Sequence, residues 1–211
     1  MTVTSQAATR EQAAEQEWNQ LRRPRITSSR FREVCFVRGV SSAESLAERI
    51  LKGTKQTAEM KRGAEMEFEA AVEYSKMKNV NYRPSGLIIH PDVPWLGASP
   101  DGLIYDPSTQ PPFGLLEIKY PNVKSYMDCK NIQMQHGTSA LRESHSYFWQ
   151  IQGQLLITGL QWCNFVVCAL EDMMVQRIYV DPKVTVAIRE RVDQFYFNVY
   201  MPKYLSFCKM V

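Results

Sequence analysis

The stretch that decides the fold runs from Gly97 to Tyr120 and reads GASPDGLIYDPSTQPPFGLLEIKY. Two apolar runs, Gly102 to Tyr105 and Phe113 to Ile118, flank a segment rich in proline, serine and aspartate. Apolar runs separated by such turn-forming residues predict two strands joined by a loop. The centre of the chain is therefore expected to be a β-hairpin.

The register of this hairpin predicts a cluster of charged side chains. If the loop is centred near Thr109, Asp101 lies opposite Glu117, and their Cβ atoms are about 4.5–5.5 Å apart on one face. Strand alternation places Lys119 on the same face. Two carboxylates this close repel each other unless a cation lies between them, and Mg²⁺ prefers such oxygen ligands. A lysine beside the metal can orient or deprotonate an attacking water, provided that its pKa is lowered.

A second interpretation is a charged hairpin in which Glu117 pairs with Lys119 while Asp101 belongs to a turn. The residues around Glu117 argue against this interpretation, because Leu116 and Ile118 help to make the strand apolar on both faces. Such a strand is typical of a buried position, where charged groups are costly unless they have a function.

A helix predicted from about Glu59 to Lys78 offers a third carboxylate. Small and apolar residues recur on one stripe of this helix, and Glu67 is the charged member of that stripe. A carboxylate among small residues, which allow close approach to a sheet, should be half buried and needs a cation or hydrogen-bond donors. Glu67 is therefore a candidate metal ligand, and a structural salt bridge is the alternative.

Length and composition indicate one globular domain spanning residues 1–211, with residues 1–8 frayed. The chain has no apolar run of about 18 residues, and its N-terminus does not resemble a secretory signal. The five cysteines are odd in number and form no C-x-x-C motif. These features predict an intracellular protein, cytoplasmic or nuclear, that is neither secreted nor bound to a membrane.

The net charge is only +3, but five arginines crowd between positions 22 and 32. A clustered arginine face is typical of phosphate contact, and a solvated basic helix end is the alternative. Ser28 and Ser29 are N-cap candidates for a helix over about 28–37, and a helix N-terminus also favours phosphate binding.

A helix predicted over about 146–159 places Gln150 and Gln154 together at i, i+4. Either amide could bond a water or a phosphate oxygen if it faces inward, and an amphipathic helix with exposed amides is the alternative. Residues 121–143 have little periodicity and are expected to form loop and short helix. Further strands are predicted over 86–90, 162–169 and 173–180, before a final helix that begins at Pro182 and kinks or ends at Pro202.

These motifs resemble the core of the PD-(D/E)XK nucleases and, more narrowly, the YqaJ-type viral recombinases, the family of the phage lambda exonuclease. The resemblance covers Trp18 to about Ala169 and comprises four motifs in the family's order. They are the Trp18, Leu21, Arg22, Ile26, Thr27 and Ser29 opening, Gly63 with Glu67, Ser99-Pro100-Asp101-Gly102 followed by Leu116-Glu117-Ile118-Lys119, and Tyr147 with Gln150. Tyr120 departs from the family, whose members commonly carry cysteine before the proline.

The resemblance implies an α/β fold with a mixed central sheet flanked by helices. It also implies a Mg²⁺-dependent nuclease that holds one or two ions, with Mn²⁺ as a substitute. The implied ligands are Glu67, Asp101, Glu117 and the Ile118 carbonyl. Lys119 would activate water and Gln150 would help to position it, while Arg22 and Ser29 would hold a terminal phosphate.

The implied activity is hydrolysis of double-stranded DNA from its ends, with a preference for a 5′-phosphate, in recombination or DNA processing. The implied partners are DNA, a single-strand annealing protein and further copies of the chain in a ring-shaped trimer. Two alternatives stay open at this point, an RNA-cleaving nuclease of the same fold and a nucleic-acid-binding derivative without activity.

Overall fold

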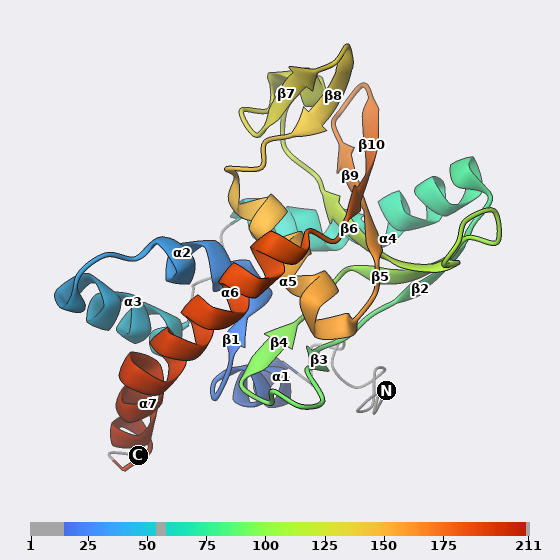
Figure 1. Ribbon diagram of the computed structural model, residues 1–211. Coiled ribbons are helices and arrows are strands. Elements are labelled where there is room, and N and C mark those ends of the chain that lie inside the picture. The colour runs from blue at the N-terminus through green and yellow to red at the C-terminus, as the bar shows by residue number, and fades with distance from the viewer. Residues whose placement is uncertain (1–14, 54–57, 210–211) are drawn as a thin grey trace.

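The computed structural model describes residues 15–53 and 58–209, and its centre is a mixed β-sheet with helices on both faces (Figure 1). This arrangement confirms the predicted α/β class. The first helix, α1, spans Glu15–Arg22. Residues 1–8, which were expected to be frayed, lie outside the described residues.

The central sheet has five strands in the order β10-β9-β6-β5-β2. Strand β6 lies in the middle, pairs antiparallel with β5 and runs parallel to β9. In the β5–β6 pair Gly102 lies opposite Leu116 and Leu103 lies opposite Leu115, so continuing the register by one residue puts Asp101 opposite Glu117, as predicted. The strands are β2 (Asn81–Pro84), β5 (Gly102–Tyr105), β6 (Phe113–Lys119), β9 (Trp162–Cys168) and β10 (Met173–Tyr179).

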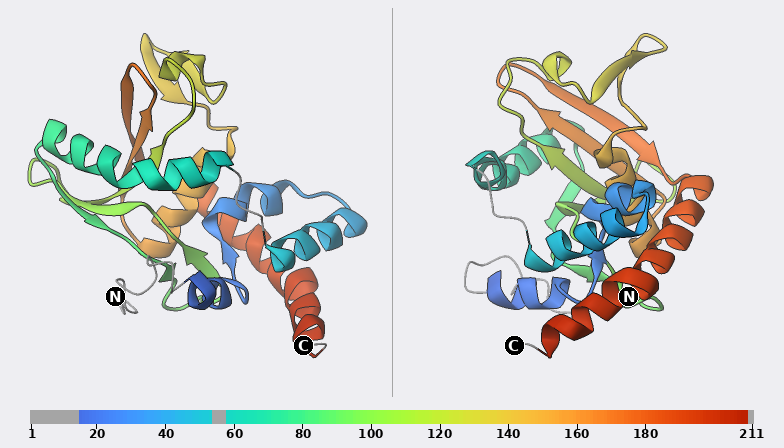
Figure 2. Two further views of the ribbon diagram at one scale, coloured as in Figure 1. Left: turned by 180° about the vertical axis from the view of Figure 1, so that it is seen from behind. Right: turned by 90° about the vertical axis from the view of Figure 1, so that its left-hand side faces the viewer.

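Different helices cover the two faces of this sheet, as Figure 2 shows from behind and from the side. Helix α4 (Ala58–Lys78) packs Ala70, Ala71 and Tyr74 against Leu116 and Ile118 of β6 and their neighbours. Helix α5 (Ser146–Thr158) packs against the opposite face, the one that carries Leu115. Because side chains alternate along a strand, Glu117 lies on the α5 face.

A second apolar cluster joins the N-terminal and C-terminal parts of the chain beside the sheet. It includes Ile26, Phe31, Leu46, Leu96 and Ile188. Strands β1 (Ile26–Thr27), β3 (Ile88–Ile89) and β4 (Leu96–Ala98) form a small sheet in the order β1-β4-β3. The helical elements of this part are the 3₁₀ turn Ser28–Arg30, α2 (Phe31–Phe36), α3 (Val40–Lys52), α6 (Pro182–Phe195), a π-helical turn Tyr196–Tyr200 and α7 (Met201–Cys208).

The C-terminal helix begins at Pro182 as predicted, and a π-helical turn, Tyr196–Tyr200, separates α6 from α7 just before Pro202, where a kink or an end was predicted. Pro202 lies in the first turn of α7, where its missing N–H removes no helical bond. Tyr200 has a structural role, because it is fully buried and its hydroxyl donates to the Arg23 carbonyl at 2.6 Å. The Tyr196 hydroxyl likewise donates to the Pro24 carbonyl at 3.1 Å.

The prediction for residues 121–143 was wrong in part. A 3₁₀ turn, Tyr126–Asp128, matches the expected short helix, but β7 (Ile132–Gln135) and β8 (Thr138–Leu141) form a hairpin that projects from the body in Figure 1. His136 and Gly137 both have positive φ, the backbone of a two-residue hairpin turn. The predicted strand over 86–90 also shrinks to β3, while β2 at the sheet edge was missed.

Close approach of α5 to the N-terminal part depends on Gly153. A Cβ atom at this position would lie 2.3 Å from the Phe31 ring and 3.2 Å from Ser28 Cβ. Glycine therefore lets α5 lie against the 3₁₀ turn Ser28–Arg30 on one side while its glutamines face the sheet on another. Gly63 in α4, by contrast, has no atom within 4 Å of such a Cβ among the described residues.

We expect Gly153→Ala to destabilise the protein by about 1–3 kcal/mol, because the added methyl group would overlap the Phe31 ring in a packed core. Gly63→Ala is the matched control, and it should stabilise α4 by about 0.5–1 kcal/mol because alanine is the better helix former. Thermal or urea unfolding of the two variants measures both changes. Equal effects at the two positions would contradict the role given to Gly153.

Candidate active site

The candidate site lies at the end of β6, where Asp101 and Glu117 stand side by side. The backbone N–H of Asp101 donates to the Leu116 carbonyl at 3.1 Å, and Asp101 Oδ2 accepts from the Ile118 N–H at 2.6 Å. The Asp101 side chain is thus fixed along the strand that carries Glu117. The Glu117 side chain is 1% exposed, which is unusual for a charged group.

Three side chains donate hydrogen bonds to the buried Glu117 carboxylate. The Lys119 ammonium and the Gln150 amide both contact Oε1, and the distance from Gln150 Nε2 is 2.7 Å. Gln154 Nε2 donates to Oε2 at 2.7 Å. These bonds offset the cost of burying a charge, and the glutamines confirm that this face of α5 points inward.

The electrostatics of the site follow from burial and from the crowding of like charges. Burial and the neighbouring Glu117 raise the pKa of Asp101 well above its usual value, and Glu67 acts in the same direction. Burial lowers the pKa of Lys119, but Glu117 and Asp101 outweigh that effect, so the pKa lies above its usual value. Lys119 is therefore a cation here, and the lowered pKa that a base would need is not present.

Glu67 lies on α4 with its side chain half buried, as its position on the small apolar stripe predicts. Its charge contributes to the raised pKa of Asp101, so the two carboxylates belong to one electrostatic neighbourhood. Within residues 15–53 and 58–209, however, no three acidic, histidine or cysteine side chains converge tightly enough to form a ready metal cage. Lys119 and the Ile118 N–H occupy carboxylate oxygens of Glu117 and Asp101 instead.

The donor set nevertheless suits a hard divalent cation. Two adjacent carboxylates, with a third nearby, supply the oxygen ligands that such an ion prefers. The Lys119 ammonium already pairs with Glu117 and neutralises part of this negative charge, so a positive group is favourable beside the two carboxylates. We conclude that the residues present fit Mg²⁺ or Mn²⁺, if Lys119 and Asp101 turn from their current partners.

Arg22 and Ser29, the predicted phosphate-binding pair, are linked through Thr27. Arg22 Nη2 donates to Thr27 Oγ1 at 3.1 Å, and the Thr27 and Ser29 hydroxyls lie 3.3 Å apart. Burial and the nearby Arg30 lower the pKa of Arg22 to about 10, so it is still a cation at neutral pH. Its guanidinium also lies 4.0 Å from the centre of the Trp18 ring. Trp18 is half exposed in this arrangement.

Sequence reasoning left Gln154 and Thr27 out of the predicted site. The i, i+4 spacing of Gln150 and Gln154 was a usable signal for the first, because residues at that spacing share a helix face. For Thr27 the signal was weaker, since its role depends on how the chain turns between α1 and the 3₁₀ turn. The contact of Gln154 joins α5 to β6, which are distant in sequence, whereas the contacts of Thr27 are local.

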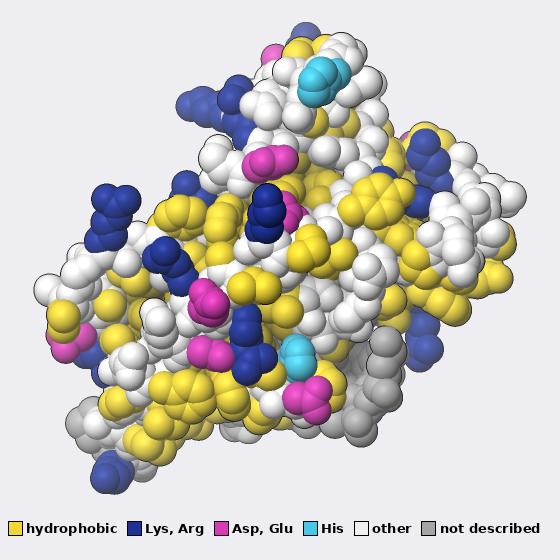
Figure 3. Space-filling view, in the orientation of Figure 1, with side chains coloured by type: hydrophobic (Ala, Val, Ile, Leu, Met, Phe, Trp, Pro, Cys, Tyr) yellow, Lys and Arg dark blue, Asp and Glu magenta, His cyan; other side chains and the backbone are white. Residues whose placement is uncertain are grey.

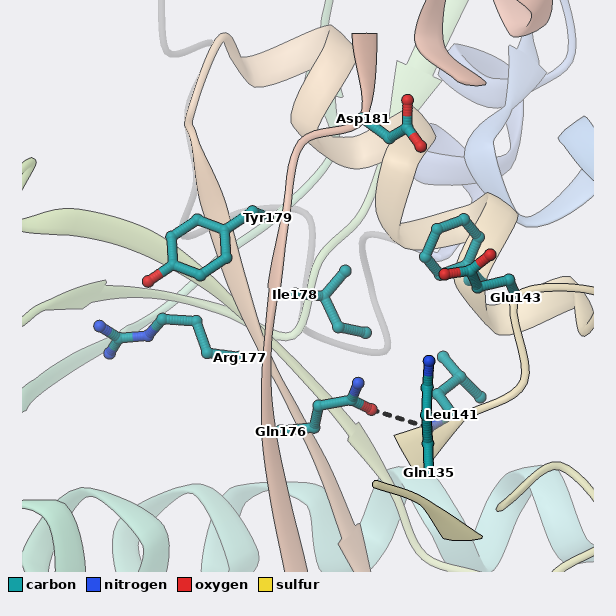
Figure 4. Close-up of a pocket in the computed structure, with 9 residues that line it drawn as sticks. Gln135, Leu141, Glu143, Gln176, Arg177, Ile178, Tyr179 and Asp181 are labelled. Atoms are coloured by element: carbon teal, nitrogen blue, oxygen red, sulfur yellow. Dashed lines mark hydrogen bonds between the residues drawn. The ribbon is translucent and has the colours of Figure 1, made fainter. Parts of the chain in front are cut away.

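A separate hollow of about 230 Å³ lies beside β10 (Figure 4). Its walls include Gln135, Leu141, Glu143 and Gln176, and the Leu141 N–H donates to Gln176 Oε1 at 2.7 Å. The residues that line it, all in the described part of the chain, include none of the predicted site residues. The hollow is therefore not the candidate active site.

The mixed sheet, with a buried glutamate between an aspartate and a lysine at the end of its central strand, defines a PD-(D/E)XK-like nuclease fold. Residues 17–161 match the YqaJ-like viral recombinase domain, and the chain belongs to that family. A search of curated proteins gave no match.

Solved structures show the same fold over most of the chain. The alkaline exonuclease LHK-Exo from Laribacter hongkongensis is 27% identical with a TM-score of 0.67, and the match covers 92% of this chain and 97% of that one. The same enzyme in complex with dAMP matches at 27% identity with a TM-score of 0.66, over the same shares of the two chains. A phage-related exonuclease from Haemophilus somnus 129PT shares the fold at 12% identity, with a TM-score of 0.59, over 92% of this chain and 99% of that one.

We expect Asp101→Asn to raise the melting temperature of the metal-free protein at neutral pH. Folding raises the pKa of Asp101, so the folded protein favours the protonated form of this side chain. The folded state is therefore stabilised in acid, and it loses that stabilisation as pH rises through the folded-state pKa. The asparagine amide carries no charge, so the variant avoids the free-energy cost of an ionised Asp101 beside Glu117. A gain of about 1 kcal/mol would raise the melting temperature by about 2–4 °C.

Calorimetry in a chelator, at pH 7.5 and again near pH 4, measures this effect. The gain should shrink at the lower pH, where Asp101 is itself protonated. A lower melting temperature for Asp101→Asn at both pH values would contradict the account of a repulsive carboxylate pair.

Proposed function

We propose that the chain is a Mg²⁺-dependent exonuclease that hydrolyses phosphodiester bonds at the ends of double-stranded DNA. Family membership and the similarity to an alkaline exonuclease support a DNA exonuclease. The observation that carries the proposal is the buried Glu117 carboxylate beside Asp101, with Lys119 on the same strand face. Such a concentration of charge at the end of a central strand is costly to stability and is typical of a functional site.

Glu67, Asp101, Glu117 and the Ile118 carbonyl would hold the metal. A bound divalent ion supplies Lewis-acid stabilisation of the charge that develops on the phosphoryl oxygens and lowers the pKa of bound water. Mn²⁺, which accepts the same oxygen ligands, should substitute for Mg²⁺.

The protein side chains have separate tasks in this proposal. Lys119 holds a proton at Nζ in the structure, so its first task is to offer positive charge to a phosphoryl oxygen. It would accept a proton from water only after the charge of Glu117 and Asp101 is neutralised, since these two carboxylates raise its pKa. Gln150 holds Glu117 Oε1 and is thereby placed to orient a water beside the same oxygen.

Arg22, Thr27 and Ser29 would bind the terminal 5′-phosphate. A guanidinium and two hydroxyls converge there, and the neighbouring Arg30 adds positive charge. Helix α5 connects this cluster to the carboxylates, because Gly153 packs against Ser28 and Phe31 while Gln150 and Gln154 hold Glu117. A phosphate in the cluster would thus be held in a fixed relation to the scissile bond.

Long-range charge contributes little to DNA attraction in this proposal. The net charge is only +3, and Figure 3 shows basic side chains dispersed between acidic and apolar ones over the face in view. Local groups such as Arg22 must then supply most of the recognition.

None of the helices in the described part of the chain is long and apolar enough to span a membrane.

Digestion of end-labelled linear DNA and covalently closed DNA tests the proposal, with Mg²⁺ or a chelator in parallel. We expect mononucleotide release from the linear substrate with Mg²⁺, and neither substrate should be cut in chelator. Cutting of closed DNA would contradict an exonuclease, and faster cutting of a matched RNA would favour the RNA-cleaving alternative.

The ring trimer and the annealing partner stay predictions. Light scattering tests the trimer, because it measures the mass of the assembly in solution.

Glu117→Gln and Lys119→Ala should each reduce the cleavage rate at least about 100-fold, because the first removes a proposed metal ligand and the second removes positive charge from the phosphoryl oxygen. DNA binding should persist in both variants, since the Arg22 cluster is intact. Single-turnover rates and filter binding separate the two effects. Cleavage near the wild-type rate in either variant would remove that residue from the catalytic group.

Arg22→Ala should lower the initial rate about tenfold or more on 5′-phosphorylated ends, because a hydrogen bond to a charged group contributes about 1.5–3 kcal/mol. The loss on 5′-hydroxyl ends should be smaller. Arg23→Ala is the matched control, an exposed neighbour whose guanidinium lies over the Phe207 ring instead. Equal losses on both ends at fixed salt would reduce Arg22 to part of a diffuse basic surface.

A further inference from the structure

Gln154 is fully buried, although only one end of its side-chain amide has a hydrogen-bond partner. Its side chain is 0% exposed, and its Nε2 donates to Glu117 Oε2 at 2.7 Å. Its own carbonyl oxygen, Oε1, is buried as well, and no donor in the described part of the chain reaches it. A buried acceptor without a donor costs stability, so another requirement must fix the amide in this orientation.

Glu117 imposes that requirement. A carboxylate oxygen only accepts hydrogen bonds, so the amide must present its NH₂ group to Oε2, and the carbonyl must then point away. Rotating the amide by about 180° would point Gln154 Oε1 at Glu117 Oε2, and two acceptors would then face each other. The unpaired oxygen is therefore a consequence of holding Glu117 Oε2 in place.

The two oxygens of Glu117 are held in different ways. Oε1 contacts Lys119 and Gln150, whose side chains are half exposed and have room to move. Oε2 is held by Gln154, which is enclosed by the packed interior of α5 and the sheet. A cation that approached Glu117 would displace the Lys119 ammonium from Oε1 and leave Oε2 with its amide.

We propose that Gln154 is a positioning residue that selects the metal by restricting Glu117 to coordination through one oxygen. Mg²⁺ demands near-ideal six-coordination and takes single carboxylate oxygens, whereas Ca²⁺ takes six to eight ligands and readily uses both oxygens of one carboxylate. Holding Oε2 therefore disfavours Ca²⁺ and leaves Mg²⁺ unaffected. This inference rests on the proposed metal site at Glu117.

The same helix provides a matched control. Gln152 is also 0% exposed, but its Nε2 donates to the Tyr179 carbonyl at 2.9 Å and its Oε1 accepts from the Asp181 N–H at 2.8 Å. It is as buried as Gln154 and of the same chemistry, and it has no contact with Glu117. Replacing it should affect stability without affecting the choice of metal.

Isothermal titration with MgCl₂ and with CaCl₂, without DNA, measures the selectivity directly. Gln154→Met removes the amide while it keeps the length of the side chain. We expect the Ca²⁺ affinity to rise about tenfold relative to that of Mg²⁺, which is the scale of one hydrogen bond to a charged group. Gln152→Met should keep the wild-type ratio. An unchanged ratio in folded Gln154→Met, or an equal change in Gln152→Met, would overturn the inference.

Glu117→Gln separates this inference from the proposed function. If Glu117→Gln binds Mg²⁺ as the wild type does, the proposed metal site itself fails. If it loses Mg²⁺ while Gln154→Met keeps the wild-type ratio, only the role of Gln154 fails. Gln154→Ala serves as the second variant should Gln154→Met not fold, and the shift in melting temperature with each metal gives the same comparison.

Discussion

The burial of a single carboxylate, Glu117, is the constraint on which the rest of the site depends. A charge that is 1% exposed on the central strand of a sheet needs compensation, and Lys119, Gln150 and Gln154 supply it. Asp101 adds a second negative charge beside it, so the three donors leave the group still short of positive charge. The structure thus holds a local instability that a divalent cation would relieve.

The fold explains how the donors reach Glu117. Strands β6 and β9 are parallel, so the chain must cross from one to the other, and α5 lies on that connection. The crossing puts Gln150 and Gln154 of α5 against Glu117, and Gly153 lets another side of the helix lie on the Ser28–Arg30 turn. One helix therefore supports both the proposed catalytic carboxylate and the proposed phosphate-binding cluster.

The sequence predicted those parts of the site that depend on local patterns. The proline-rich loop set the register that puts Asp101 opposite Glu117, and helical periodicity singled out Glu67. Periodicity also put Gln150 and Gln154 on one face of α5, but it left open whether that face points inward. The charge state of Lys119 was not predictable, because it results from a balance between burial and two carboxylates. The β7–β8 hairpin was missed because its residues are mostly polar, and only Ile132, Ala140 and Leu141 are buried. Thr27 joined the phosphate cluster through contacts that no periodicity encodes.

The central claim is that the Asp101–Glu117 pair is a metal site in which Gln154 holds Glu117 Oε2, while an ion would take Oε1 in place of Lys119. Anomalous diffraction from crystals soaked in MnCl₂ tests it most directly, because Mn²⁺ is located without reference to activity. The account predicts an anomalous peak bonded to Asp101 and to Glu117 Oε1, with Gln154 Nε2 still on Oε2. A peak that lies away from both carboxylates, or two Glu117 oxygens on the same ion with Gln154 displaced, would contradict it.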